Sequence, residues 1–95
     1  MLRDELTSDV AGIILESLRS VKGRLTEVSN LSGINRRELN RRGLAKMRMS
    51  RLMRLVYAML LIMPPKKFDA MWQKILEKLR EYAKDFDFIL LDERR

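Results

Sequence analysis

Apolar side chains recur every three or four positions along most of this sequence, which is the spacing of one face of an α-helix. Only four glycines and two prolines interrupt the 95 residues, so most of the chain can be helical. We therefore expect an all-α fold, a small bundle of about five helices in a single domain spanning residues 1–95. The first helix is expected from about Asp4 to Val21, with apolar residues Leu6, Val10, Ile13, Ile14, Leu18 and Val21.

Two short helices are expected next, on either side of a glycine. Thr26 is a favourable N-cap for a second helix that ends near Ser32. Gly33 supplies a residue that can adopt the positive φ of a sharp turn. Asn35 is the next good N-cap, and it predicts a third helix from about Arg36 to Arg42.

A longer fourth helix follows. Gly43 is expected to end the third helix, and Ser50 to cap the fourth, which runs through Met63. Pro64 and Pro65 end that helix, and Pro65 also suits the first turn of the next one.

A fifth helix is expected over about residues 66–84. Its apolar residues step by four and three positions, as in a heptad seam: Phe68, Trp72, Ile75, Leu79, Tyr82 and Phe86. Two uses of this seam remain open, since it can fold onto the first helix and close the core, or pair with a second copy. The tail after Asp85 is too apolar to stay in water, so we expect it to dock on the body or on a partner subunit.

Several functional classes are disfavoured by what the chain lacks. Cysteine and histidine are absent, which removes disulfides, thiol chemistry, the usual general base and the commonest metal ligand. No glycine-rich phosphate loop or metal-ligand cluster is present. The close acid pairs outside the first helix, Asp85 with Asp87 and Asp92 with Glu93, lie among neutralising bases near the tail. We expect no enzyme, no cofactor and no metal.

The sequence also indicates whether the protein is secreted or held in a membrane. Residues 1–9 carry acids rather than the basic start and apolar stretch of a secretion signal. The longest apolar run, Leu55 to Met63, is too short to span a bilayer as a helix. A soluble cytoplasmic protein is expected.

The positive charge is concentrated in the middle third of the chain. The net charge is +7, and residues 24–54 alone hold nine bases and two acids, which is 9 − 2 = +7. Eight of those nine bases are arginine, whose guanidinium forms forked contacts with phosphate and guanine. Such concentration indicates either a polyanionic partner or a solvated basic face.

Residues 26–42 also carry the features of a helix-turn-helix at their required offsets. Ser29 is small where two helices cross closely, and Val28 before it points inward. Gly33 turns the chain, Ile34 plugs the turn, and Leu39 lies five residues later as a core position.

Residues Leu25 to Leu60 resemble the lambda-repressor-like, or Cro-type, helix-turn-helix family (also called the XRE family). The run Met49 to Leu60 is similar to the family's helix that packs beneath the motif. The chain departs from the family pattern at Ser29, where alanine is usual, and at Arg42, where an apolar residue is usual. The resemblance implies a transcriptional regulator that binds double-stranded DNA, often as a homodimer.

The expected DNA contacts follow from side-chain chemistry. The third helix enters the major groove, where arginine can bind guanine and asparagine can bind adenine through two hydrogen bonds. The residues expected to read bases are Arg36, Arg37 and Asn40. The residues expected at phosphates are Thr26, Asn35, Arg41, Lys46, Arg48 and Arg51. Arg42 and Arg54 are ranked lower because they can pair with acids of the first or last helix.

Two rival functions use the same features. The apolar fifth helix and tail suit a protein-interaction module, including an antitoxin-like regulator that binds both DNA and a protein. The arginine cluster also suits RNA. The operator, the sign of regulation and the oligomeric state are not determined by the sequence.

Overall fold

The protein is described by a computed structural model that covers residues 2–83, with side chains from residue 5 onward. Five α-helices and two 3₁₀ helices make up this part of the chain, and it contains no strand, which confirms the expected all-α bundle. The elements are α1 (Leu2–Leu18), η1 (Arg19–Arg24), α2 (Leu25–Ser32), η2 (Arg36–Glu38), α3 (Arg41–Ala45), α4 (Met49–Ile62) and α5 (Pro65–Ala83).

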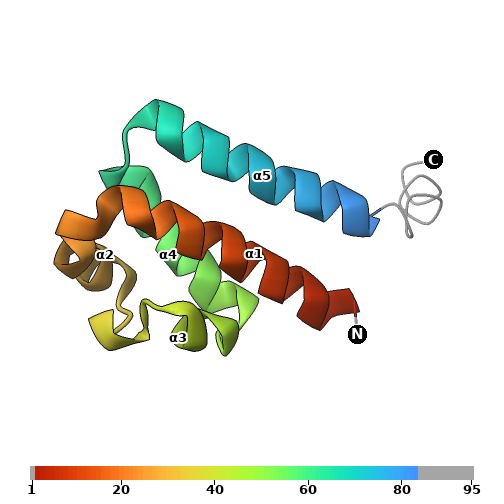
Figure 1. Ribbon diagram of the computed structural model, residues 1–95, viewed down its shortest axis with the longest axis horizontal. Coiled ribbons are helices and arrows are strands. Elements are labelled where there is room, and N and C mark those ends of the chain that lie inside the picture. The colour runs from red at the N-terminus through yellow and green to blue at the C-terminus, as the bar shows by residue number, and fades with distance from the viewer. Residues whose placement is uncertain (1, 84–95) are drawn as a thin grey trace.

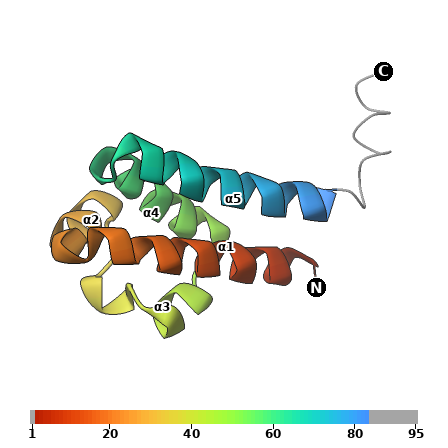
Figure 2. The same ribbon diagram turned by 45° about the horizontal axis from the view of Figure 1, so that its top comes forward.

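The helices are arranged around α1 and α4. Helix α5 lies along one side of α1, and α3 lies on the opposite side of it (Figure 1). Figure 2 shows the same order, with α5 on one surface, α4 and α1 beneath it, and α3 on the other surface. One apolar core joins them, and its fully buried side chains include Val10, Ile14, Leu52, Leu55, Met59, Met71 and Ile75.

Helix α1 is shorter than the sequence predicts, because it ends at Leu18 rather than near Val21. Residues 19–24 form η1 instead, and Val21 leaves the helical region with φ −119° and ψ 25°. The Val21 side chain is nevertheless buried, as its apolar spacing predicts. The tighter 3₁₀ winding turns the chain toward α2 while the apolar contact with the core is kept.

Two predicted N-caps are each wrong by two residues. Thr26 lies inside α2, which begins at Leu25, because the residue that leaves the helical region before this helix is Arg24, with φ −123° and ψ 24°. Ser50 lies inside α4, which begins at Met49, because the extended residue before the helix is Arg48, with φ −75° and ψ 158°. Neither helix has a side-chain cap at its start.

Helix α5 begins at Pro65, where a missing backbone N–H has no cost. Phe68 and Ile75 of its predicted seam are buried, Trp72 is half-buried, and Leu79 is 39% exposed. The hydroxyl of Tyr82 donates a 2.8 Å hydrogen bond to Asp9, which fixes the far end of α5 on α1. Helix α5 therefore packs on the first helix through its buried side chains, while Trp72 and Leu79 lie at the margin of that contact. The expected docking of the tail after Asp85 falls outside the described residues.

Among residues 2–83, no helix combines the length and the apolar composition needed to cross a bilayer.

Candidate nucleic-acid interface

The turn between α2 and η2 is held by a small set of polar contacts. Gly33 adopts φ 72°, as its position in the sequence predicts, and its N–H donates to the Ser29 carbonyl at 2.9 Å. The Ser29 hydroxyl donates to the Ile34 carbonyl at 2.6 Å. Ser29 is thus more than a small residue at a helix crossing, since its hydroxyl closes the turn that Gly33 opens.

Sequence reasoning missed Ser32, which is the one buried polar residue in the described core. Its hydroxyl oxygen accepts a 3.2 Å hydrogen bond from the Ile34 N–H. This contact satisfies a donor that the left-handed glycine leaves without a helical partner. The signal was available, because a serine directly before a helix-ending glycine is placed to bond the backbone two residues on.

The segment expected to form one helix over residues 36–42 is broken. Asn35 is the predicted N-cap, and its side chain accepts from the Arg37 N–H at 2.9 Å. The turn that follows ends after Glu38, however, and Leu39 (ψ 59°) and Asn40 (φ −147°, ψ 174°) leave the helical region. The predicted continuous recognition helix is therefore wrong, and η2, a kink and α3 stand in its place.

Asn40 explains why a new helix, α3, begins after the kink. Its side-chain oxygen accepts from the Gly43 N–H at 2.8 Å, which makes Asn40 the N-cap of α3, and its amide group donates to the Arg37 carbonyl. Asparagine in a helix interior gains no such bond, so it favours a cap whenever the surroundings permit one. Asn40 was expected to read adenine, but its amide is committed to these two local bonds.

Gly43 permits that arrangement, and it lies inside α3 rather than ending the preceding helix. A Cβ on Gly43 would overlap the carbonyl oxygen of Glu38 and come within 2.8 Å of the Glu38 Cα. Real Cβ atoms are not found so close to backbone. The absence of a side chain at Gly43 therefore allows α3 to fold back tightly against the end of η2.

Apolar side chains fix this corner on the body of the protein. Ile34 and Leu44 are 1% exposed, and Leu39 and Met47 are also buried. Leu39 was predicted as a core position, and it stays one although the helix around it is interrupted. Burial of four apolar side chains over fourteen residues holds the basic segment in one orientation against α1 and α4.

Both acids of the basic middle third are paired with neighbouring arginines. Glu27 contacts Arg24 at 2.6 Å, and Glu38 contacts Arg51 at 3.1 Å. The Arg24–Glu27 hydrogen bond lowers the pKa of Glu27 and raises that of Arg24, so both stay charged near neutral pH. Arg24 also donates to the Ile62 carbonyl at 3.2 Å, which satisfies the end of α4.

Arg51 was expected at a phosphate, and in the structure it is paired with Glu38. Its guanidinium donates to both carboxylate oxygens of Glu38, which compensates its charge within the protein. Thr26 lies exposed on α2 instead of capping it, so its predicted phosphate contact loses the helix-start geometry on which it was based.

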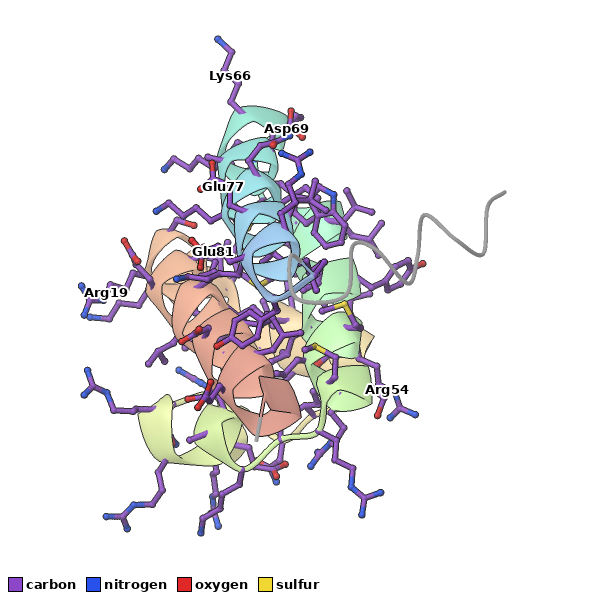
Figure 3. All side chains as sticks on the ribbon, turned by 90° about the vertical axis from the view of Figure 1, so that its right-hand side faces the viewer. Arg19, Arg54, Lys66, Asp69, Glu77 and Glu81 are labelled. Atoms are coloured by element: carbon purple, nitrogen blue, oxygen red, sulfur yellow. The ribbon has the colours of Figure 1, made fainter. Side chains whose placement is uncertain are left out.

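The remaining bases of residues 24–54 carry the uncompensated charge. Seven of the nine are both exposed and without an ion pair to any described residue: Arg36, Arg37, Arg41, Arg42, Lys46, Arg48 and Arg54. Arg42 and Arg54 belong to this set, although they were ranked lower because they can pair with acids of the first or last helix. Figure 3 shows nitrogen-tipped side chains extending from the η2–α3 end of the molecule, on the side opposite α5. Asn35, also expected at a phosphate, is exposed beside them.

A groove lies between α1 and α3, next to this basic segment. Its volume is about 410 Å³, and Ala11, Leu15 and Leu44 form much of its apolar lining. Arg19 and Arg41 lie at its edges together with Glu16. Glu16 is 3.8 Å from Lys74 of α5, so its charge is shared with the opposite side of α1.

In the described residues, no group of three or more acidic, histidine or cysteine side chains lies close enough together to hold a metal ion. No protein-family model matches the chain, and no curated protein or solved structure shows a significant match to it.

Proposed function

We propose that this protein binds double-stranded DNA in a sequence-dependent way and acts as a transcriptional regulator. One observation carries the proposal. Seven exposed bases without an ion-pair partner in the described chain lie within nineteen residues, 36–54. Four of the seven belong to the corner formed by η2 and α3. A charge used only for solubility has no reason to be gathered in one place and kept free of its own acids.

The local geometry supports DNA over a generic polyanion. A helix, a left-handed glycine and a second helical segment present guanidinium groups from a rigid corner, as a helix-turn-helix does. The resemblance to the Cro-type family points the same way. Arg36 and Arg37 lead this corner and are exposed, so they are the proposed base readers.

The kink after Glu38 changes how the segment would enter a groove. Arg36 and Arg37 lie on η2, whereas Arg41 and Arg42 begin α3 on the other side of the kink. We assign Arg41, Lys46 and Arg48 to phosphates, and add Arg42 and Arg54 to the groups able to contact the backbone. Asn40 is assigned to positioning of α3 and not to base reading.

Two copies are proposed to act on one site. A single corner of this size reads only a few base pairs, whereas regulators of this type gain affinity from two half-sites about one helical turn, or about 34 Å, apart. The proposed target is therefore a near-palindrome bound by a homodimer.

The decisive experiment is selection of bound fragments from random duplex DNA, followed by fluorescence anisotropy on the selected site. We expect enrichment of a two-fold symmetric sequence and affinity that falls steeply with salt. The test variant is Arg36→Gln with Arg37→Gln. Its matched control is Lys66→Gln with Lys67→Gln, which removes the same charge from exposed positions at the start of α5, far from α3 (Figure 3).

The two variants separate specific binding from net charge. The Arg36/Arg37 variant should lose discrimination between the selected site and random DNA, while the Lys66/Lys67 variant should keep it. Equal losses in both variants would refute a dedicated interface. Stronger binding to folded RNA than to any duplex would reassign the corner to RNA.

A protein-interaction role is the second candidate, and one observation favours it. Tyr57, Leu60 and Leu61 of α4 are 58%, 51% and 55% exposed, which is unusual for large apolar side chains on one helix face. Absence of binding to any duplex at low salt would favour this role over DNA binding.

A further inference from the structure

The described residues leave an apolar face uncovered between α4 and α5. On α4, Tyr57 and Leu60 are more than half exposed, and Met53, four residues before Tyr57, is half-buried on the same side. Met53, Tyr57 and Leu60 are spaced by four and three residues, so they lie above one another on the helix. Arg54, which precedes Tyr57 by three residues, points outward from α4 in Figure 3 and marks the edge of this face.

The second side of the face comes from α5. Lys67, Met71 and Lys74 line a groove against α1, which identifies the α1 side of the helix. The other flank of α5, which faces away from α1, carries Trp72, Leu76 and Leu79. Trp72 and Leu76 are half-buried, and Leu79 is 39% exposed. We call the set Met53, Tyr57, Leu60, Trp72, Leu76 and Leu79 the α4–α5 face.

The size of the α4–α5 face limits what can cover it. A stable dimer buries about 800 Å² on each partner. Six side chains, three of them already partly covered, do not supply that area by themselves. A short apolar segment of about five large side chains matches the face better, since each aromatic ring alone can bury about 150–250 Å².

The chain carries such a segment directly after α5. Residues 84–95 follow Ala83, and among these twelve residues are five large apolar ones: Phe86, Phe88, Ile89, Leu90 and Leu91. Twelve residues can reach about 40 Å, whereas the distance along α5 from Leu79 to Trp72 is about 10 Å. Attachment at Ala83 also gives the segment an effective concentration in the millimolar range, which a separate molecule does not have.

The charges beside the α4–α5 face also favour this segment as its occupant. Arg54 and Arg80 lie beside the face on α4 and α5, and neither forms an ion pair with a described residue. The segment brings four acids, Asp85, Asp87, Asp92 and Glu93, and three bases, Lys84, Arg94 and Arg95, so its net charge is 3 − 4 = −1. We propose that residues 84–95 are the occupant of the α4–α5 face of their own molecule, with their apolar side chains on it and their acids toward the two arginines.

The chain is well suited to a direct test, because it has no cysteine and a single tryptophan. A nitroxide attached through Arg94→Cys labels the end of the segment and leaves its five apolar residues unchanged. The proposal expects strong paramagnetic broadening of the amide signals of Tyr57 and Leu60 and of the Trp72 indole N–H in the full chain. Reduction of the nitroxide should restore these signals.

A matched variant removes the apolar contact and keeps the label. Arg94→Cys combined with Phe88→Ser and Leu91→Ser should lose the broadening at Tyr57 and Leu60. A chain that ends at Ala83 should show about twofold stronger quenching of Trp72 fluorescence by acrylamide, because its ring loses its cover.

Three results would overturn the proposal. Broadening at Gly12 and Ala45 would place the segment in the α1–α3 groove instead. Broadening seen only when labelled and isotope-enriched chains are mixed would make the occupant a second copy. Unchanged acrylamide quenching of Trp72 fluorescence in both the shortened chain and the serine variant would show that the segment does not cover the face. None of these readouts depends on DNA, so they are independent of the proposed function.

Discussion

The guanidinium of Arg51 donates to both carboxylate oxygens of Glu38, at 3.3 and 3.1 Å, and so joins α4 to η2 across thirteen residues of sequence. Planar, two-bonded pairing of this kind is specific to arginine and fixes orientation as well as distance. The pair holds one end of the basic corner, while Asn40 and Gly43 hold the other. It also compensates the charge of Glu38, the only acid of η2.

Neutralising either partner of the pair should destabilise the protein modestly. Both side chains are about 40% exposed, so solvent screening keeps the coupling small, on the order of 0.5–1 kcal/mol. A double-mutant cycle with Glu38→Gln, Arg51→Gln and the double variant, measured by urea unfolding, gives the coupling directly. It should shrink in high salt. Strict additivity of the two single effects would show that the pair contributes nothing.

Substitution of Gly43 by alanine should be among the more damaging small changes in the chain. The new Cβ meets the Glu38 backbone, which cannot move without opening η2, so we expect a loss of about 1–3 kcal/mol in unfolding free energy. Thermal or urea unfolding provides the measurement.

Gly12→Ala is the matched control for that substitution. Gly12 lies in α1, and nothing stands within 4 Å of a Cβ built there. Alanine at this position should stabilise by about 0.5–1 kcal/mol, because a helix-interior glycine is replaced without a clash. Equal effects of the two alanines would contradict the close approach of α3 to η2.

Tyr82 should lose its proton at a higher pH than a free tyrosine, and the loss should lower the free energy of unfolding. The hydrogen bond from its hydroxyl to Asp9 raises the pKa of Tyr82 to about 12, with burial as the next cause. An unfolded tyrosine titrates near pH 10. Because the folded pKa is the higher one, the stabilisation from this contact is complete below pH 10 and is lost as the pH rises toward 12.

The measurement compares wild type with Tyr82→Phe. Their difference in unfolding free energy should narrow between pH 10 and 12, and a constant difference would rule the contact out. A Tyr57→Phe background leaves Tyr82 as the only tyrosine, so its ultraviolet titration can be followed alone.

The sequence predicts well those features that depend on neighbours along the chain. Gly33 takes the left-handed conformation and Asn35 caps the next turn, because both choices are made by bonds within two to four residues. The helical spacing of Ile34, Leu39 and Leu44 likewise identifies residues that are buried. Pro65 begins α5 for an equally local reason.

The features that were missed depend on contacts across the fold. Whether Asn40 continues a helix or starts a new one is decided by the approach of Gly43 to Glu38, which no local pattern reveals. The pairing of Arg51 with Glu38 requires α4 to lie beside η2. The order of the bases along the sequence therefore could not show that Arg51 has an acidic partner. Charge clustering predicted the basic surface but not which of its members would be free.

Arg36 and Arg48 should respond differently if the corner reads DNA as proposed. Both are exposed and without an ion pair in the described chain, so their net charges are equivalent. Arg36 leads η2, where a guanidinium can form two hydrogen bonds with guanine, and Arg36→Ala should lower the preference for one base pair by about 1–3 kcal/mol.

Arg48 immediately precedes α4 and is the proposed phosphate contact. Arg48→Ala should weaken binding equally on all sequences and reduce the slope of log affinity against log salt by about 0.9, the share of one phosphate. Anisotropy titrations on the selected site and its single-base variants, each at several salt concentrations, measure both quantities. A uniform loss with Arg36→Ala would move Arg36 to a phosphate, and an unaltered salt slope with Arg48→Ala would remove Arg48 from the interface. If both occurred together, Arg37 would be the one exposed arginine of η2 left to read bases.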